Sequence, residues 1–225
     1  MRTSRIFRDW RGLSTAAVAT AALAMTAVVT LGGFSATVAN PSNNFSSGTI
    51  QLKEGVGATT CYSTGTGAGG SVSSANTNAA CAGDDLGGKL LQVPGGAPQA
   101  TTITLTNVGN VAAATSNLLA GACSQAASAD DGGYVGSDAA FCGKVDVTVN
   151  NNTTSKCVFP VAAVACTAPT NANTLASLAA QNLTLSGLAA GASATYTVTV
   201  QLDTTATNAD QGLTATIPLT WSITQ

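Results

Sequence analysis

The chain has 225 residues, of which only 8% are charged, and it contains no histidine. Beyond residue 36 it carries four lysines against nine acids, so the net charge of that part is −5, with no arginine left. Because no basic patch exists to displace counterions from phosphate, nucleic acid is a poor partner, and an anionic membrane surface is disfavoured for the same reason.

The N-terminus has the pattern of an export signal. A cationic start precedes an uncharged, mostly apolar run from Leu13 to Phe34, and small residues follow it. We expect residues 1–36 to form a helical signal peptide that is cleaved near Ala36 or Ala39. Since the run exceeds the ~7–15 residues of a usual signal core, a retained membrane anchor is the alternative. Either way the rest of the chain is placed outside the cell, because the arginines stay in the cytoplasm: Arg2, Arg5, Arg8 and Arg11.

Strand signals dominate the remainder of the chain. Several segments alternate apolar and polar residues with the period of two of a half-buried strand. Strong helical periods do not alternate with them, which argues against parallel βαβ units and favours an all-β antiparallel sandwich. Pro218 predicts an edge position or a bulge, because proline cannot donate to a ladder. The predicted strands are Gly48–Leu52, Thr101–Asn107, Val145–Val149, Thr195–Leu202 and Leu213–Thr224.

Turns, one helix and two long loops complete the predicted elements. Pro94-Gly95-Gly96 and Leu188–Gly191 are turns, each leading into a Thr-rich strand. Asn173–Ala180 predicts a short helix with Leu175, Leu178 and Ala179 on one side. The Gly/Ser/Asn-rich stretches Ser63–Ala80 and Ser124–Ala140 are longer than the loops of compact domains usually are, so we expect them to be stapled.

Six cysteines lie in the exported part, and an even number in an oxidising compartment predicts three disulfides. Fifteen connectivities are possible, and free buried thiols are the alternative. We predict the sequential pairing, in which each bond closes one of the glycine-rich loops. Closing a loop of roughly 20 residues stabilises a fold by about 3 kcal/mol in the chain-entropy model. The pairs are Cys61–Cys81, Cys123–Cys142 and Cys157–Cys166.

Two stretches of the sequence resemble the TasA/camelysin family. The apolar run ends in Leu31-Gly-Gly-Phe-Ser35, followed by Asn43-Asn-Phe45-Ser-Ser-Gly48-Thr-Ile50-Gln-Leu52. The C-terminal part reads Tyr196-Thr-Val-Thr-Val200, then Asn208-Ala-Asp-Gln211-Gly212-Leu213 and a final Thr224-Gln225. Members end their signal with Gly-Gly-(aromatic)-x-(aromatic)-Ser and continue with N-x-F-x-x-G-T-hydrophobic-x-L. This chain differs in lacking the usual Asp, with Ala36 and Thr37 in its place, and in having six cysteines.

The resemblance implies a jelly-roll-like β-sandwich, exported through a SipW-type signal peptidase and assembled into extracellular or biofilm-matrix fibres. It also implies that an N-terminal strand completes the sheet of a neighbouring subunit, which is β-strand addition. The matching segment is residues 37–52, with Phe45, Gly48, Ile50 and Leu52 as its assembly residues, and residues 53–225 form a single sandwich domain.

Catalytic chemistry has little support in the sequence. Without histidine, a zinc protease motif and the histidine-dependent nucleophile triads are impossible, and we expect no enzymatic activity. Two phosphate-loop look-alikes are attributed to composition. Gly65-x-Gly67-x-x-Gly70 lacks a following helix, and Gly83-x4-Gly88-Lys89 is followed by Leu90 instead of Ser or Thr.

No cofactor is expected, and only a weak metal possibility remains. Two sets of acids, Asp84 with Asp85 and Asp130 with Asp131 and Asp138, lie in glycine-rich loops where carboxylates could bind calcium, although solvated turn residues are the favoured interpretation. Trp221 lies on the apolar face of a strand and is predicted to be core.

The sequence therefore predicts a secreted structural protein, a fibre subunit at the cell surface or in a biofilm matrix. Its partners would be copies of itself and, during export, a signal peptidase; the membrane is contacted only through the signal segment. The alternative is a monomeric adhesin or ligand-binding sandwich, for which Tyr62 and Tyr134 are the candidate loop aromatics.

Overall fold

The computed structural model describes residues 46–64, 81–88, 92–129, 135–161, 166 and 168–225. Residues Ser47–Gln225 form one compact unit. The predicted signal segment, its cleavage residues Ala36 and Ala39, and Phe45 lie outside the described residues. Within the described part of the chain, no helix has the length and hydrophobicity needed to cross a bilayer.

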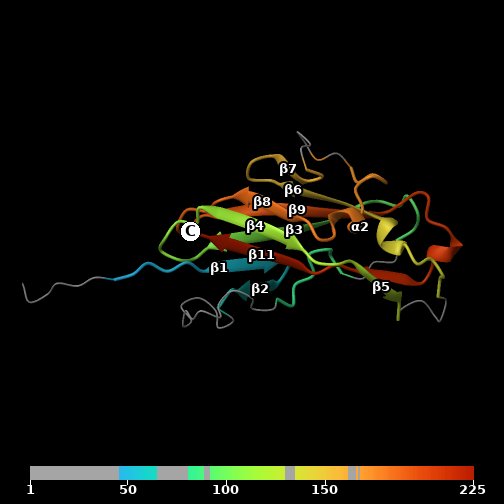
Figure 1. Cartoon of the computed structure of the whole chain (residues 1–225), viewed down its shortest axis with the longest axis horizontal. Helices are drawn as coiled ribbons and strands as arrows, with labels where there is room; N and C mark the ends of the chain where they lie inside the picture. Colours follow the sequence, from blue (N-terminus) through green and yellow to red (C-terminus); the bar gives the residue numbers. More distant parts are fainter. Residues whose placement is uncertain (1–45, 65–80, 89–91, 130–134, 162–165, 167) are drawn as a thin grey trace, which may run out of the picture. The chain divides into compact units, whose positions relative to one another are not determined.

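The described residues form an antiparallel β structure with very little helix, as the sequence predicts (Figure 1). Besides the strands there are two 3-10 turns, η1 (Phe141–Gly143) and η2 (Asn208–Asp210), and the one-turn helix α2 (Leu175–Leu178). The strands are β1 (Leu52–Val56), β2 (Thr59–Tyr62), β3 (Gln99–Asn107), β4 (Thr115–Ala120), β5 (Ser124–Ala127), β6 (Val145–Asn151), β7 (Lys156–Phe159), β8 (Asn182–Ser186), β9 (Ser193–Leu202), β10 (Leu213–Thr216) and β11 (Leu219–Thr224).

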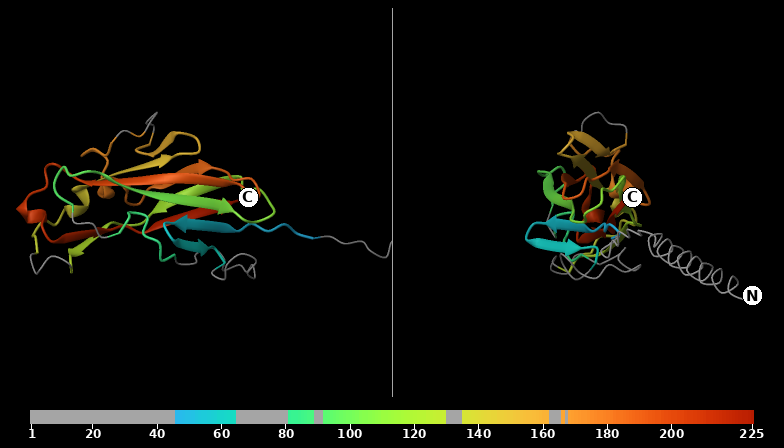
Figure 2. Two further views of the ribbon diagram at one scale, coloured as in Figure 1. Left: turned by 180° about the vertical axis from the view of Figure 1, so that it is seen from behind. Right: turned by 90° about the vertical axis from the view of Figure 1, so that its left-hand side faces the viewer.

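The strands form two layers of unequal width. One layer is a six-stranded sheet in the order β2-β1-β3-β9-β6-β7. The other is a three-stranded sheet, β11-β4-β8, and β10 and β5 pair beyond its end. Figure 2 shows the layers from behind and end-on. One hydrophobic cluster joins them, because inward residues of both sheets belong to it: Ile103, Val149 and Tyr196 from the wide sheet, Leu118, Leu183 and Trp221 from the narrow one.

The segments with the clearest alternation of apolar and polar residues form central strands of the wide sheet. Ile103 and Leu105 of β3 are fully buried, while Thr104 between them points away from the core. In β9, Tyr196 and Val198 are buried in the same way. Fully burying a side chain of this size contributes roughly 1.5–3 kcal/mol, so alternation determines which face of the strand packs inward. The predictions of Thr101–Asn107, Val145–Val149 and Thr195–Leu202 are confirmed.

The predicted strand Gly48–Leu52 is wrong, because the strand begins at Leu52 and ends at Val56. The loop between β3 and β4 holds the preceding residues instead. The Thr49 amide donates to Asn110 Oδ1 at 2.6 Å, and the Thr49 carbonyl accepts from the amides of Asn110 and Val111. At Gly48 the backbone approaches this loop so closely that a Cβ atom would lie 1.8 Å from Val111 Cγ2.

The predicted strand Leu213–Thr224 is divided by an irregularity at Pro218. Thr216 lies opposite Ser124 and Leu219 opposite Ala120, so the partner strand has one extra residue across this break. The Gly121 amide donates to the Pro218 carbonyl at 2.8 Å. The prediction for proline is confirmed on both counts, since Pro218 lies at a bulge and the following strand, β11, is at an edge of its sheet.

The helix and both turns are confirmed, and one loop prediction is partly wrong. Thr174 caps α2 by accepting from the Ser177 amide, and Leu175 and Leu178 are fully buried. Gly95 and Gly191 have positive φ angles in the two turns. The segment predicted as the loop Ser124–Ala140 contains β5, which pairs with β10.

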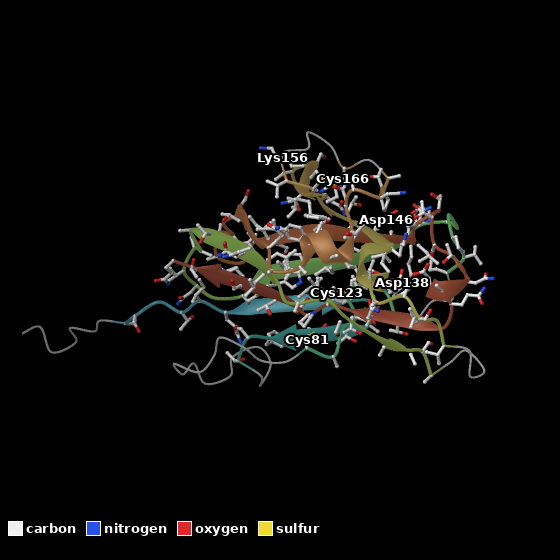
Figure 3. All side chains as sticks on the ribbon, turned by 45° about the vertical axis from the view of Figure 1, so that its right-hand side comes forward. Cys81, Cys123, Asp138, Asp146, Lys156 and Cys166 are labelled. Carbon is white, nitrogen blue, oxygen red and sulfur yellow. A yellow bond between two sulfur atoms is a disulfide. The ribbon has the colours of Figure 1, made fainter. Side chains whose placement is uncertain are left out.

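The three disulfides form as predicted, in sequential order. Cys61–Cys81 joins β2 to the segment 81–88, Cys123–Cys142 joins the start of β5 to η1, and Cys157–Cys166 joins β7 to residue 166. Of the predicted loop Ser63–Ala80, all but the first two residues lie outside the described part of the chain. Cys81 and Cys166 lie on opposite sides of the domain in Figure 3. Formed disulfides indicate an oxidising compartment.

Candidate functional site: the β11 edge and the loop over it

Strand β11 is an edge of the narrow sheet. It pairs with β4 on one side, and among the described residues no other backbone group bonds to its outer side. Because Gly121 and Pro218 are a hydrogen-bonded pair, alternation along the antiparallel ladder directs the backbone groups of Leu219, Trp221 and Ile223 away from β4. These three residues therefore carry the unpaired N–H and C=O groups of the edge.

The side chains at this edge point into the domain. Trp221 is 7% exposed and contacts Tyr196 of the opposite sheet, with ring centroids 5.0 Å apart. Leu219 and Ile223 are partly buried against the same core. The prediction that Trp221 is core is confirmed. The edge thus combines free backbone hydrogen-bonding groups with an apolar inner face, which is what an added strand requires.

A loop, Cys81–Gly88, lies between this edge and β1. Its turn is closed by the Gly87 amide, which donates to the Asp84 carbonyl at 3.0 Å, and by the Leu86 amide, which donates to Asp84 Oδ1 at 2.9 Å. The Trp221 indole Nε1 donates to Asp85 Oδ2 at 2.9 Å. Leu86 packs against the core. This loop contains the first six residues of the phosphate-loop look-alike, and its glycines serve a turn here.

Glu54 of β1 lies beside Asp85. It occupies the inward face of its strand, between the buried residues Leu52 and Val56. Its carboxyl group hydrogen-bonds to that of Asp85. Burial, and to a lesser degree the neighbouring negative charge of Asp85, together raise the pKa of Glu54 to about 7. Burial also raises the pKa of Asp85, although the Trp221 indole opposes this. The pair thus shares a proton near neutral pH.

Four other acids lie at two further places in the domain. Asp146, 3% exposed, has a pKa raised to about 6 by burial and by the charge of Asp203. Asp138 lies next to Asp210, and the pKa of Asp138 is lowered, chiefly because its carboxylate accepts the Ala140 amide. Asp138 and Asp146 are labelled in Figure 3.

The weak calcium prediction gains no support. Asp130 and Asp131 lie outside the described residues, and Asp138 is engaged with its own turn and with Asp210. Within the described ranges, no three His, Cys, Asp or Glu side chains gather in a way that would hold a metal ion.

A cavity of about 800 Å³ lies in the part of the domain that contains α2 and η2. Its walls include the apolar residues Phe141, Leu175 and Val200. Asp210 also lines it and is only 5% exposed; one of its oxygens accepts from the Thr207 amide at 2.7 Å. Tyr62, proposed as a loop aromatic, instead ends β2, and Tyr134 lies outside the described residues.

Of the four proposed assembly residues, the structure describes three. Leu52 is buried in the chain's own sheet, and Gly48 lies against the chain's own β3–β4 loop. Residues from Ser47 onward belong to the compact unit, so the C-terminal part of the predicted donor segment 37–52 lies within the chain's own domain.

The sequence analysis missed Glu54, and it named Asp85 only as a weak calcium candidate. A weak signal for Glu54 was present, because an acid stands between Leu52 and Val56 at the inward positions of β1. Nothing local indicates that Asp85 meets Glu54 and Trp221, which are distant in the sequence. A comparison with models of known protein families gave no match, and a comparison with curated protein sequences gave none either.

Proposed function

We propose that this protein is a secreted structural subunit that assembles into extracellular fibres by β-strand addition, on a jelly-roll-like sandwich. The observation that supports this most directly is the β11 edge, where Leu219, Trp221 and Ile223 present unpaired backbone groups above an apolar interior. A strand added there would widen the narrow three-stranded sheet toward the width of the six-stranded one.

The donor in this proposal is the N-terminal segment of a second copy, freed when the signal peptide is removed. The segment runs from the cleavage site near Ala36 or Ala39 to Phe45, just before the compact unit begins at Ser47. The three disulfides support a location outside the cell. The absence of histidine from the sequence favours a structural role over catalysis.

Electron microscopy and size-exclusion chromatography of the secreted protein test the proposal. Phe45→Asp should abolish fibres, because it places a charge where the donor must be buried; Asn43→Asp, with the same added charge, should retain more assembly. Ile223→Pro removes an outward-pointing N–H of β11 and should also prevent assembly, whereas Ile223→Val keeps it. A secreted protein that stays monomeric, or fibres that form equally in all four variants, would refute the proposal.

The alternative function, a monomeric ligand-binding sandwich, is favoured by one observation, the cavity of about 800 Å³ near α2. Its size lies within the range of small-molecule pockets, and its mixture of apolar walls with a buried acid is typical of them. Screening the secreted monomer against glycans and small amines, with Leu213→Trp to fill the cavity, distinguishes this function from assembly.

A further inference from the structure

The loop Cys81–Gly88 connects the two layers of the domain at the β11 edge. At its start, Cys81 is bonded to Cys61 of β2, on the wide sheet. Two residues later, Gly83 lies against β1 so closely that a Cβ atom would be 3.1 Å from Val56 Cβ. One side of the loop is therefore fixed covalently and by close packing.

The contact of the loop with the narrow sheet is of a different kind. Asp85 accepts one hydrogen bond from the Trp221 indole at 2.9 Å, and no described backbone group of the loop bonds to β11. Leu86 adds an apolar contact with the core. A strand added along the outer side of β11 would need the space beside Trp221, so the loop must move away before the edge can be used.

The groups that face Glu54 leave its charge uncompensated. From the loop these are Asp85 and, further out, Asp84, which is also negative; β11 contributes the uncharged Trp221. On β3, Leu105 lies opposite Glu54, and on β2 the disulfide-bonded Cys61 does. Lys53 alternates to the other face of β1. No described cation therefore opposes the acids.

We propose that the loop Cys81–Gly88 is a latch that covers the β11 edge while Glu54 and Asp85 share a proton, and that loss of this proton to solvent opens it. This inference rests on the proposed strand addition, because the uncovered edge would receive the donor segment of a second copy. With the proton present, one carboxyl group donates to the other, and Asp85 keeps its bond with the indole. With the proton lost, two carboxylates repel each other in a partly buried site.

The direction of the switch follows from the acids. Because burial raises the pKa of Glu54 to about 7, the latch is closed in mildly acidic solution and opens as the pH rises through neutrality. The Cys61–Cys81 bond keeps the open loop attached, so that it closes again when the pH falls. Subunits would thus be held unassembled at acid pH.

Tryptophan fluorescence tests the latch separately from assembly. In a Trp10→Phe background the full chain has Trp221 as its only tryptophan. Between pH 5 and 9 we expect the emission of the monomer to shift to the red and acrylamide quenching to increase, with a midpoint near pH 7. Glu54→Gln, which keeps a neutral hydrogen-bonding group, should remove this transition. Asp85→Asn should also remove the transition, and it is the variant to use if Glu54→Gln does not fold. Asp84→Asn, at an exposed position, should retain the transition.

Fibre growth provides the second measurement. Below the midpoint the deprotonated fraction falls about tenfold per pH unit, so the initial growth rate should fall by the same factor, and Glu54→Gln should grow slowly at every pH. A flat fluorescence profile, or an unchanged transition in both Glu54→Gln and Asp85→Asn, would refute the latch. A fluorescence transition of the monomer without any fibres would leave the latch intact and refute the proposed function instead. If the initial growth rate of the fibres does not depend on pH, the proposed control of assembly by the latch is refuted.

Discussion

Buried acids that have no cationic partner among the described residues are the most unusual residues of this domain. Asp146, Asp203 and Asp210 are each at most 5% exposed. Two of them are stabilised by their own turns: Asp203 accepts the Thr205 amide at 2.6 Å, and Asp210 accepts the Thr207 amide at 2.7 Å. Asp146 has a buried oxygen without a described partner. Burial raises the pKa of Asp146, and the neighbouring negative charge of Asp203 adds to this effect.

Tyr196 shows that a central core residue need not have optimal contacts. It is fully buried and its ring packs against Trp221 at a tilted angle, yet its hydroxyl group has no hydrogen-bond partner among the described residues. Leaving such a group unsatisfied costs roughly 1–3 kcal/mol. The ring, in contrast, contributes a large apolar surface to both layers.

Tyr196→Phe should therefore be neutral or should increase the free energy of unfolding, by up to about 1 kcal/mol. Tyr196→Ala should lower it by about 3–5 kcal/mol, because it leaves a cavity between the sheets. Denaturant unfolding at one pH measures both variants. A Phe variant less stable than the parent protein would show that the hydroxyl group is satisfied in solution.

At the scale of elements, alternation identified the strands whose inward residues are all apolar, and it failed at strands with small or polar inward residues, including β4 at the centre of the narrow sheet. The inward residues of β4 include Ser116, which is fully buried, so its pattern does not read as apolar and polar. The strand β5 (Ser124–Ala127) has no large apolar side chain, and only pairing with β10 makes it a strand. The short β7 follows an Asn/Thr-rich segment and ends before Pro160, so it is too short to show a period. Asn182–Ser186 does alternate, with Leu183 and Leu185 inward, and was recognisable.

The candidate site was less predictable than the fold. Pro218 predicted that the last strand lies at an edge. The alternation of apolar residues in that strand predicted that Trp221 is part of the core. The contact between Asp85 and Trp221 joins residues 136 positions apart. No local rule predicts such a contact, because it depends on how the two sheets pack and on where the first disulfide places its loop.

Removing individual disulfides should lower the free energy of unfolding by amounts that depend on the length of the loop that each one closes. In the chain-entropy model, removing the bond Cys123–Cys142, which spans 19 residues, should cost about 3 kcal/mol, and doubling the loop length adds only about 0.6 kcal/mol. The bond Cys157–Cys166 spans 9 residues and should therefore cost slightly less. Paired Cys→Ala variants and denaturant unfolding measure this. If removing Cys157–Cys166 is the more damaging change, native-state contacts at β7 outweigh chain entropy.

For the whole molecule, the unequal widths of the two layers and the low charge act together. A three-stranded sheet on a six-stranded one leaves inner-face surface beyond β11, which the domain covers with a loop that contains two acids. With few charges elsewhere, the carboxyl groups of Glu54, Asp85 and Asp146, whose pKa values are all raised, dominate the response to pH.

We predict that the protein becomes more stable as the pH falls from 8 to 5. The folded-state pKa values of Glu54, about 7, and Asp146, about 6, lie above the ordinary values of 4.5 and 3.8. The folded state therefore binds more protons, and stability is lost as the pH rises through these values. Allowing for solvent screening at partly exposed Glu54, the gain should be on the order of 1–2 kcal/mol.

Thermal unfolding between pH 5 and 8 tests this prediction. Asp146→Asn should raise the melting temperature at pH 8 and should lose that advantage by pH 4, where both forms are neutral. A parent protein most stable at pH 8, or a variant effect that does not depend on pH, would contradict it.

The Cys61–Cys81 bond also has a practical consequence. It closes residues 62–80 into a ring whose two ends are fixed, with Cα atoms 5.5 Å apart. Lengthening a closed ring costs little free energy, so a foreign epitope or enzyme-recognition peptide inserted there should leave the sandwich intact. If the subunits polymerise as proposed, each copy would carry the insert at regular intervals, and the filament would become a scaffold for display.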